Sequence, residues 1–235
     1  MLAEAQKQYL LQLFRNINNN YTLKRALFAS DFHLGMPDYH SSRKREDKII
    51  SWLDKYTGEV DVIFFLGDVF DFWFEYKRAV PRGYMRLFGK LAQLSDNGVQ
   101  LYFFKGNHDM WFFDYFKQEL NAKIISDEME VEIAGKRFFM HHGDGLGPGD
   151  YSYKFLKQFF RSNFCQWLFA RLHPNFGIGL ASYFSKSSRM AKGSVLPHQG
   201  KDKELIEQYI LEQDKKDRAD FYLCGHRHLA EELVL

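Results

Sequence analysis

Hydrophobic residues occur along the chain in two patterns: short continuous runs, and longer stretches in which they recur every three or four positions. The continuous runs predict buried strands, and they lie at residues 27–29, 60–66, 99–104 and 221–224. The helical repeat predicts helices at residues 2–18, 43–56, 83–96 and 202–217. The first should be a peripheral helix, and Ser41 or Ser42 should be the N-cap of the second. Strands and helices alternate up to residue 104, which predicts an α/β core in βαβαβ order.

The second half of the chain departs from this alternation. Residues 130–134 and 137–141 alternate in polarity about Gly135, which predicts a β-hairpin. Residues 151–200 contain no Asp or Glu, but seven Lys or Arg and eleven aromatic residues. We therefore expect an inserted helical cap. The expected organisation is an N-terminal helix at 1–20, a core formed by 21–147 and 201–235, and a cap at 148–200.

Charge, hydropathy and cysteine usage exclude several classes of protein. The formal net charge of +2 is too small for a general nucleic-acid binder, and the basic residues of the cap are mixed with bulky apolar ones. No apolar run approaches the roughly 18 to 20 residues of a membrane-spanning helix. Cys165 and Cys224 are far apart, and no secretory signal precedes them, so we expect a cytoplasmic protein.

Most side chains that could bind a metal lie in five short segments, each at the end of a predicted strand. These are Asp-Phe-His at 31–33, Gly-Asp at 67–68, Gly-Asn-His-Asp at 106–109, His-Gly-Asp at 142–144 and Gly-His-Arg-His at 225–228. Loops at the carboxyl ends of strands line one crevice of an open α/β sheet, so we expect the segments to converge. Carboxylates, an amide and imidazoles suit Mn, Fe or Zn better than Mg or Ca.

The spacing within the segments adds a second expectation. Asp31 and His33 are two residues apart, as are His226 and His228, and extended backbone would place both side chains of each pair on one side. Taken singly, each segment could equally be an ordinary turn. His141 should face away from its neighbour His142 and serve in packing.

The order D-x-H, G-D, G-N-H-D, H-G-D and G-H-x-H resembles that of the calcineurin-like metallophosphoesterases over about residues 26–235. The resemblance implies an α/β sandwich of mixed sheets flanked by helices, and a site with two divalent ions, expected to be Mn²⁺. It implies that the ligands of one ion are Asp31, His33, Asp68 and His228, and that those of the other are Asp68, Asn107, His142 and His226. Asp68 would bridge the two ions.

The same resemblance implies a catalytic group of Asn107, His108 and Asp109. His108 would face the scissile phosphate as electrostatic stabiliser or general acid, and Asp109 would orient it. Metal-activated water would attack phosphorus directly, without a covalent enzyme intermediate.

Longer motifs resemble those of the UDP-2,3-diacylglucosamine diphosphatases of lipid A synthesis. These motifs are D-F-H-L-G at 31–35, G-D-V-F-D-F-W at 67–73 and, in the cap, Tyr153, F-C-Q-W-L-F at 164–169, H-P at 173–174 and S-S-R at 187–189. The resemblance implies hydrolysis of UDP-2,3-diacylglucosamine to UMP and 2,3-diacylglucosamine 1-phosphate, at the cytoplasmic face of the inner membrane. Substrate contacts are expected from Tyr153, Ser188, Arg189 and Lys192.

The acid-free, aromatic cap suits this activity, because it could bury acyl chains and meet an anionic membrane surface. It could instead be a helical hairpin whose aromatics fill its own core. The chain could also be a phosphohydrolase of a different nucleotide, cyclic nucleotide or protein phosphate, or a non-catalytic metal-containing protein that binds lipid or nucleic acid. We expect no nucleic-acid partner and no obligate protein partner.

Two features depart from the family pattern. His108 stands where many of these enzymes have Arg, which makes the phosphate-facing donor titratable. The sequence also stops at Leu235, soon after the last histidine pair, whereas the fold normally adds further strands. We expect either a missing tail or a short second sheet.

Overall fold

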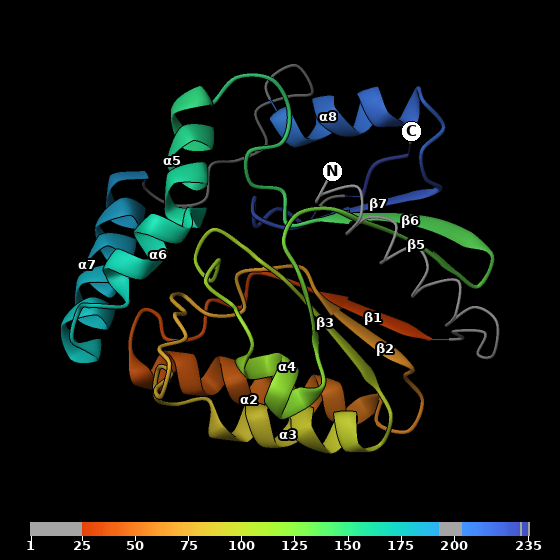
Figure 1. The fold of residues 1–235 in the computed structure, drawn as a ribbon. Helices are drawn as coiled ribbons and strands as arrows, with labels where there is room; N and C mark the ends of the chain where they lie inside the picture. The colour runs from red at the N-terminus through yellow and green to blue at the C-terminus, as the bar shows by residue number, and fades with distance from the viewer. Residues whose placement is uncertain (1–24, 193–203, 231, 235) are drawn as a thin grey trace.

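The computed structural model describes residues 25–192, 204–230 and 232–234, and within them the strands form two sheets (Figure 1). The first sheet is parallel, with the order β1 (Ala26–Ala29), β2 (Val62–Phe65), β3 (Gln100–Phe104) and β4 (Lys123–Ile125). The second contains β5 (Met129–Ile133), β6 (Lys136–His141) and β7 (Phe221–Cys224). In it β5 and β6 are antiparallel, while β6 and β7 are parallel.

Both faces of the first sheet are covered, which explains why every residue of β2 is buried. Ile63 and Phe65 pack in a cluster with the apolar sides of α2 (Tyr39–Lys55), α3 (Met85–Asp96) and α4 (Tyr115–Leu120). Val62 and Phe64 point to the opposite face, where they pack against the second sheet. Helix α8 (Leu205–Asp214) lies over the outer face of the second sheet (Figure 1). The α/β sandwich expected from the sequence is therefore confirmed.

The predicted strands and hairpin are confirmed to within two residues at each end, but several details differ. Asp38, and neither Ser41 nor Ser42, is the N-cap of α2: its carboxylate accepts the backbone N–H of Ser41 at 3.0 Å. The last predicted helix is shorter than expected. Helix α4 and strand β4 were not predicted, because elements of six and three residues are too short to show a periodic pattern. The helix predicted at 2–18 lies outside the described residues.

The acid-free segment forms helices α5 (Tyr151–Arg161), α6 (Asn163–Phe169) and α7 (Pro174–Lys192), which lie together beside the sandwich (Figure 1). Part of this cap docks on the core: Phe160 and Phe169 pack against Trp111, whose Nε1 donates to the Phe160 carbonyl at 2.9 Å. Most of the other aromatic side chains of the cap are exposed and do not form a hydrophobic core within it. The exposed ones include Phe155, Phe164, Trp167, Phe176, Tyr183 and Phe184.

Candidate metal centre

The five segments with metal-type side chains meet at the carboxyl ends of the strands. The loops after β1 and β2 run side by side, with the Asp31 and His33 amides donating to the carbonyls of Gly67 and Asp68 at 3.1 and 2.9 Å. The loop after β7 joins them, because the amide of His226 donates to the Asp31 carboxylate at 2.9 Å. Parallel pairing within both sheets thus gathers residues that are far apart in the sequence.

The backbone that presents these side chains is not extended. Asp31, His33, Asp68, His226 and His228 have φ angles of 57°, 43°, 53°, 72° and 53°, in the left-handed region. The expectation that extended backbone aligns each Asp-x-His or His-x-His pair is therefore wrong, although the paired side chains do converge. Asp and His are among the residues that enter this region most readily.

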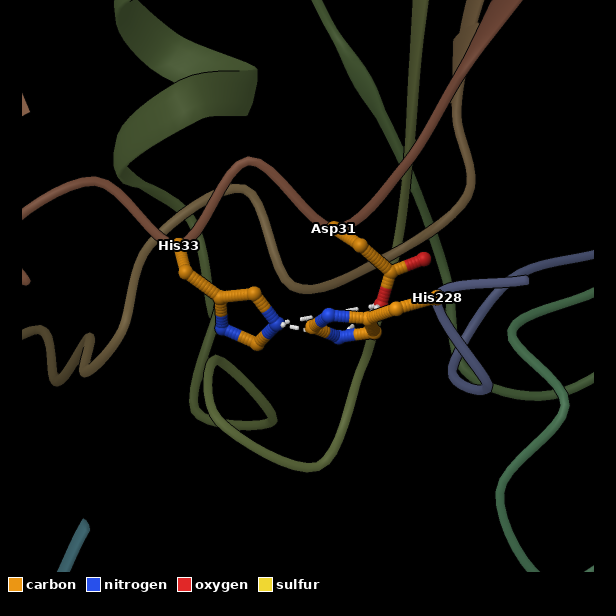
Figure 2. Close-up of side chains that lie close together, drawn as sticks. All are labelled: Asp31, His33 and His228. Atoms are coloured by element: carbon orange, nitrogen blue, oxygen red, sulfur yellow. Dashed lines mark hydrogen bonds and ion pairs between the residues drawn. The ribbon is translucent and has the colours of Figure 1, made fainter. Parts of the chain in front are cut away.

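One group of donor atoms is formed by Asp31, His33 and His228 (Figure 2). The Nε2 atoms of His33 and His228 are 2.9 Å apart and point toward each other. The Asp31 Oδ1 atom lies 3.4 Å from His228 Nε2 and 3.8 Å from His33 Nε2. The structure thus brings together three of the four residues predicted to hold the first ion.

A second group contains Asp68, His142 and His226, with one donor atom from each within 4.8 Å of the others. His142 Nε2 lies 3.3 Å from Asp68 Oδ2 and 3.2 Å from the Asn107 side-chain oxygen. The same Asp68 oxygen lies 3.6 Å from His33 Nε2 in the first group. A single carboxylate oxygen therefore stands between the two groups, as a bridging ligand would.

The donor geometry fits divalent ions. Two atoms that bind one ion at about 2.1 Å lie about 3 Å apart at a right angle and about 4 Å apart on opposite sides, and the distances above fall in this range. His142 Nδ1 lies 2.8 Å from the Leu66 carbonyl, so Nδ1 carries the hydrogen and the Nε2 lone pair faces the site. A side chain on Gly106 would collide with the Asp68 carboxylate.

Burial makes the electrostatics of this site strong. Asp68 is 1 % exposed, and although burial opposes its charge, the surrounding histidines lower the pKa of Asp68 below its ordinary value. Burial likewise disfavours the charged form of His142, yet the Asp68 carboxylate raises the pKa of His142 to about 10. A bound cation would take the place of this proton, since a metal-binding imidazole must be neutral.

Asp109 has a different place from the one expected. Its Oδ1 accepts the amides of Asp68 and Gly106 at 3.1 and 3.0 Å, and its Oδ2 accepts that of Phe70 at 3.2 Å. Asp109 thus holds two ligand loops together, and the hydrogen bonds described for its carboxylate go to backbone amides instead of the His108 ring. Its burial, followed by the charge of Asp68, raises the pKa of Asp109 to about 8.

Asp71, which was not among the predicted site residues, lies beside His108 instead. The backbone carbonyl of Asp71 is 3.0 Å from His108 Nδ1. The side-chain Oδ1 of Asp71 is 3.7 Å from the Nδ1 atoms of both His108 and His33. His108 also donates its backbone N–H to Asp68 Oδ1 at 2.9 Å. The one feature of the sequence that could have indicated this role is the position of Asp71, three residues after Asp68 in the same loop.

The expected substrate contacts are placed only in part. The Tyr153 hydroxyl donates to Asp144 Oδ2 at 2.6 Å, and Lys157 Nζ lies 2.9 Å from the same oxygen, so both join the cap to the core. Ser188, Arg189 and Lys192 lie on α7, and their side chains fall outside the described residues. His141 is buried, and its Nδ1 accepts the Gly143 amide at 2.7 Å, consistent with packing.

The chain matches a family model, curated proteins and solved structures. The model of the calcineurin-like phosphoesterases matches residues 24–230. The chain is similar to the UDP-2,3-diacylglucosamine hydrolase of Porphyromonas gingivalis, with 37 % identity over 88 % of this chain and 84 % of that protein. It is similar to a protein of the same name from Tolumonas auensis, with 25 % identity over 83 % and 79 %. A solved phosphoesterase from E. coli aligns at 21 % identity over 52 % of this chain and 59 % of the other, with a TM-score of 0.31.

Proposed function

Because the chain belongs to the calcineurin-like phosphoesterase family, we propose that it hydrolyses the diphosphate of UDP-2,3-diacylglucosamine, releasing UMP and 2,3-diacylglucosamine 1-phosphate for lipid A biosynthesis. The names of its relatives support the substrate. The observation that carries the chemistry is the position of Asp68 Oδ2, within 3.6 Å of His33 Nε2 and 3.3 Å of His142 Nε2.

Family membership implies divalent metal ions, and we infer two of them, with Mn²⁺ as the working choice. Their ligands are those of the two groups above, with Asn107 added to the second. When bound, such ions activate water and neutralise charge on phosphoryl oxygens. Asp68, which contacts both groups, keeps their spacing, and the His108 amide fixes one of its oxygens.

His108 would contact the phosphate through its Nε2 atom. Its Nδ1 lies against the Asp71 carbonyl, which can only accept a hydrogen bond, so Nδ1 carries a hydrogen. The opposite ring atom is then the one that meets the substrate. A protonated imidazole there stabilises negative charge or donates a proton to the leaving group.

The cap would bind the acyl chains. Its exposed aromatic residues offer apolar area beside the metal centre, and burial of each acyl methylene stabilises a complex by about 0.8 kcal/mol. The basic, acid-free composition of residues 151–200 would favour an anionic membrane surface. We propose peripheral attachment at the cytoplasmic face of the inner membrane. Among the described residues, no helix combines the length and apolar character needed to cross a bilayer.

The experiment that tests this function compares three substrates with the Mn²⁺-loaded protein: UDP-2,3-diacylglucosamine, UDP-glucose and an aryl phosphodiester. The proposal expects UMP from the lipid at a far higher kcat/KM than from UDP-glucose. Equal cleavage of the two would favour a phosphohydrolase of another nucleotide. Metal binding without cleavage of any substrate would indicate a non-catalytic binder.

A further inference from the structure

One side chain of the cap reaches the loops of the metal centre. Ser185 lies on α7, and its hydroxyl donates to Asp71 Oδ2 at 2.8 Å. The same oxygen of Ser185 lies 3.3 Å from His108 Nδ1. Asp71 and His108 both belong to core loops, after β2 and β3, and Asp71 is 5 % exposed. Ser185 therefore links the cap to a core loop residue that contacts the His108 ring.

The directions of these hydrogen bonds form a chain. The hydrogen on His108 Nδ1 points to the Asp71 carbonyl and can be shared with the Ser185 oxygen, while the Ser185 hydrogen goes to the Asp71 carboxylate. The hydrogen positions on His108 Nδ1 and on the Ser185 hydroxyl are thus compatible with each other and with the two acceptor oxygens of Asp71. The chain fixes the ring plane of His108 and keeps one hydrogen on Nδ1, so that the neutral ring is the Nδ1–H tautomer and the second hydrogen of the protonated ring is on Nε2.

We propose that Ser185 is a positioning residue through which docking of the cap holds the His108 imidazole in its working orientation. The inference rests on the proposed function, since it takes His108 to face the scissile phosphate. Docking of the cap also depends on the contacts of Asp144 with Tyr153 and Lys157, both on α5. A substrate that holds the cap against the core would then also hold His108, so acyl binding would raise turnover as well as affinity.

Ser185→Ala removes one hydrogen bond and leaves the helix intact. We expect kcat for UDP-2,3-diacylglucosamine to fall by about two- to twelve-fold, the change that corresponds to one hydrogen bond of ordinary strength, with KM nearly unchanged. Ser185→Thr, which keeps the hydroxyl, should restore most of the rate. The matched control is Ser187→Ala, an exposed serine two positions later on the same helix, which should behave as wild type.

A double-mutant cycle asks whether Ser185 acts through His108. The double variant Ser185→Ala with His108→Ala should be no slower than His108→Ala alone, because the group being positioned is already gone. Additive losses would overturn the inference. So would a rise in KM at unchanged kcat in Ser185→Ala, because that result would make Ser185 a direct substrate contact.

A second measurement does not depend on activity. In Zn²⁺-loaded protein with ¹⁵N-labelled histidine, the ring nitrogens of His108 should show the Nδ1–H tautomer, and Ser185→Ala should mix the two tautomers. An unchanged spectrum would overturn the inference. If His108→Ala keeps full turnover, the role of His108 in the proposed function fails. If His108→Ala is slow while Ser185→Ala matches wild type, only the positioning role of Ser185 fails.

Discussion

The Nε2 atoms of His33 and His228 lie 2.9 Å apart, although 195 positions separate the two residues in the chain. Two imidazole nitrogens approach this closely when they share a hydrogen or when both direct a lone pair at one cation. The nearby Asp31 carboxylate favours a cation in either case. The folded chain thus brings together, from distant parts of the sequence, donor atoms that suit one metal ion.

Metal removal should therefore destabilise the protein without unfolding it. Dialysis against EDTA should lower Tm, and added Mn²⁺ should raise Tm again in a concentration-dependent way. One bound ion should increase the free energy of unfolding by about 2.7 kcal/mol when the free ion is at 100 times its Kd. Differential scanning calorimetry measures both changes. A Tm that ignores EDTA and Mn²⁺ would contradict a metal centre in the folded state.

Asp68→Ala should abolish activity and remove metal from both positions. Its Oδ2 atom lies near both histidine groups, and without this carboxylate the repulsion between two cations would be unscreened. Metal content after gel filtration, measured by inductively coupled plasma mass spectrometry, checks this. The control is Asp96→Ala, at the exposed end of α3. Two ions per chain in the Asp68 variant would exclude the bridging role.

His108→Ala should lower turnover by about 10² to 10⁴ and leave metal content unchanged, because a positioned acid or charge stabiliser contributes on that scale. His108→Arg should keep more activity than His108→Ala, since a guanidinium can also contact phosphate. Steady-state kinetics with parallel metal analysis separates the two effects. Turnover near wild type in His108→Ala would make this residue structural.

Tyr153→Phe should loosen the cap. The change removes one of the two partners of the Asp144 carboxylate, which is 1 % exposed, and a hydrogen bond to a buried charge is worth about 1.5 to 3 kcal/mol. Thermal unfolding should show a lower Tm than in Tyr151→Phe, where the tyrosine is 78 % exposed. An unchanged Tm with a raised KM would instead favour the substrate contact predicted from the sequence.

Acyl length and cap cations should govern selection of the lipid. Each methylene removed from the acyl chains should weaken binding by up to about 0.8 kcal/mol, if the cap buries that methylene. Arg189→Ala and Lys192→Ala should lose affinity for the phosphorylated lipid while hydrolysis of a small aryl phosphodiester changes little. Equal losses on both substrates would mean that these residues support the fold and do not bind the lipid.

The apolar runs predicted the α/β core and the convergence of its loops, and the family resemblance implied the sandwich of two sheets. An apolar run such as residues 60–66 has few structures open to it besides a buried strand, and parallel strands place their following loops at one end. The candidate metal ligands could be found because five short segments rich in Asp, Asn and His, each at the end of a predicted strand, are unusual in ordinary turns.

What the sequence did not predict depends on local geometry and on contacts between distant segments. Periodicity carries no information on the left-handed backbone at His226 or His228. The functional place of Asp71 was missed because it is created by contacts with His33, His108 and Ser185, from three other parts of the chain. The family resemblance implied that Asp109 orients His108, whereas the carboxylate of Asp109 accepts hydrogen bonds from backbone amides.

Five residues of the metal centre have left-handed backbone, which lowers the stability of the fold although the metal site needs their side chains: Asp31, His33, Asp68, His226 and His228. Such conformations cost of order 1 to 3 kcal/mol each for residues that bear a Cβ, less for Asp and His, and almost nothing for glycine. In the metal-free state, His226→Gly should therefore resist urea better than His226→Ala, although neither binds metal normally. Selection for catalysis and selection for a stable chain thus pull these five positions in opposite directions.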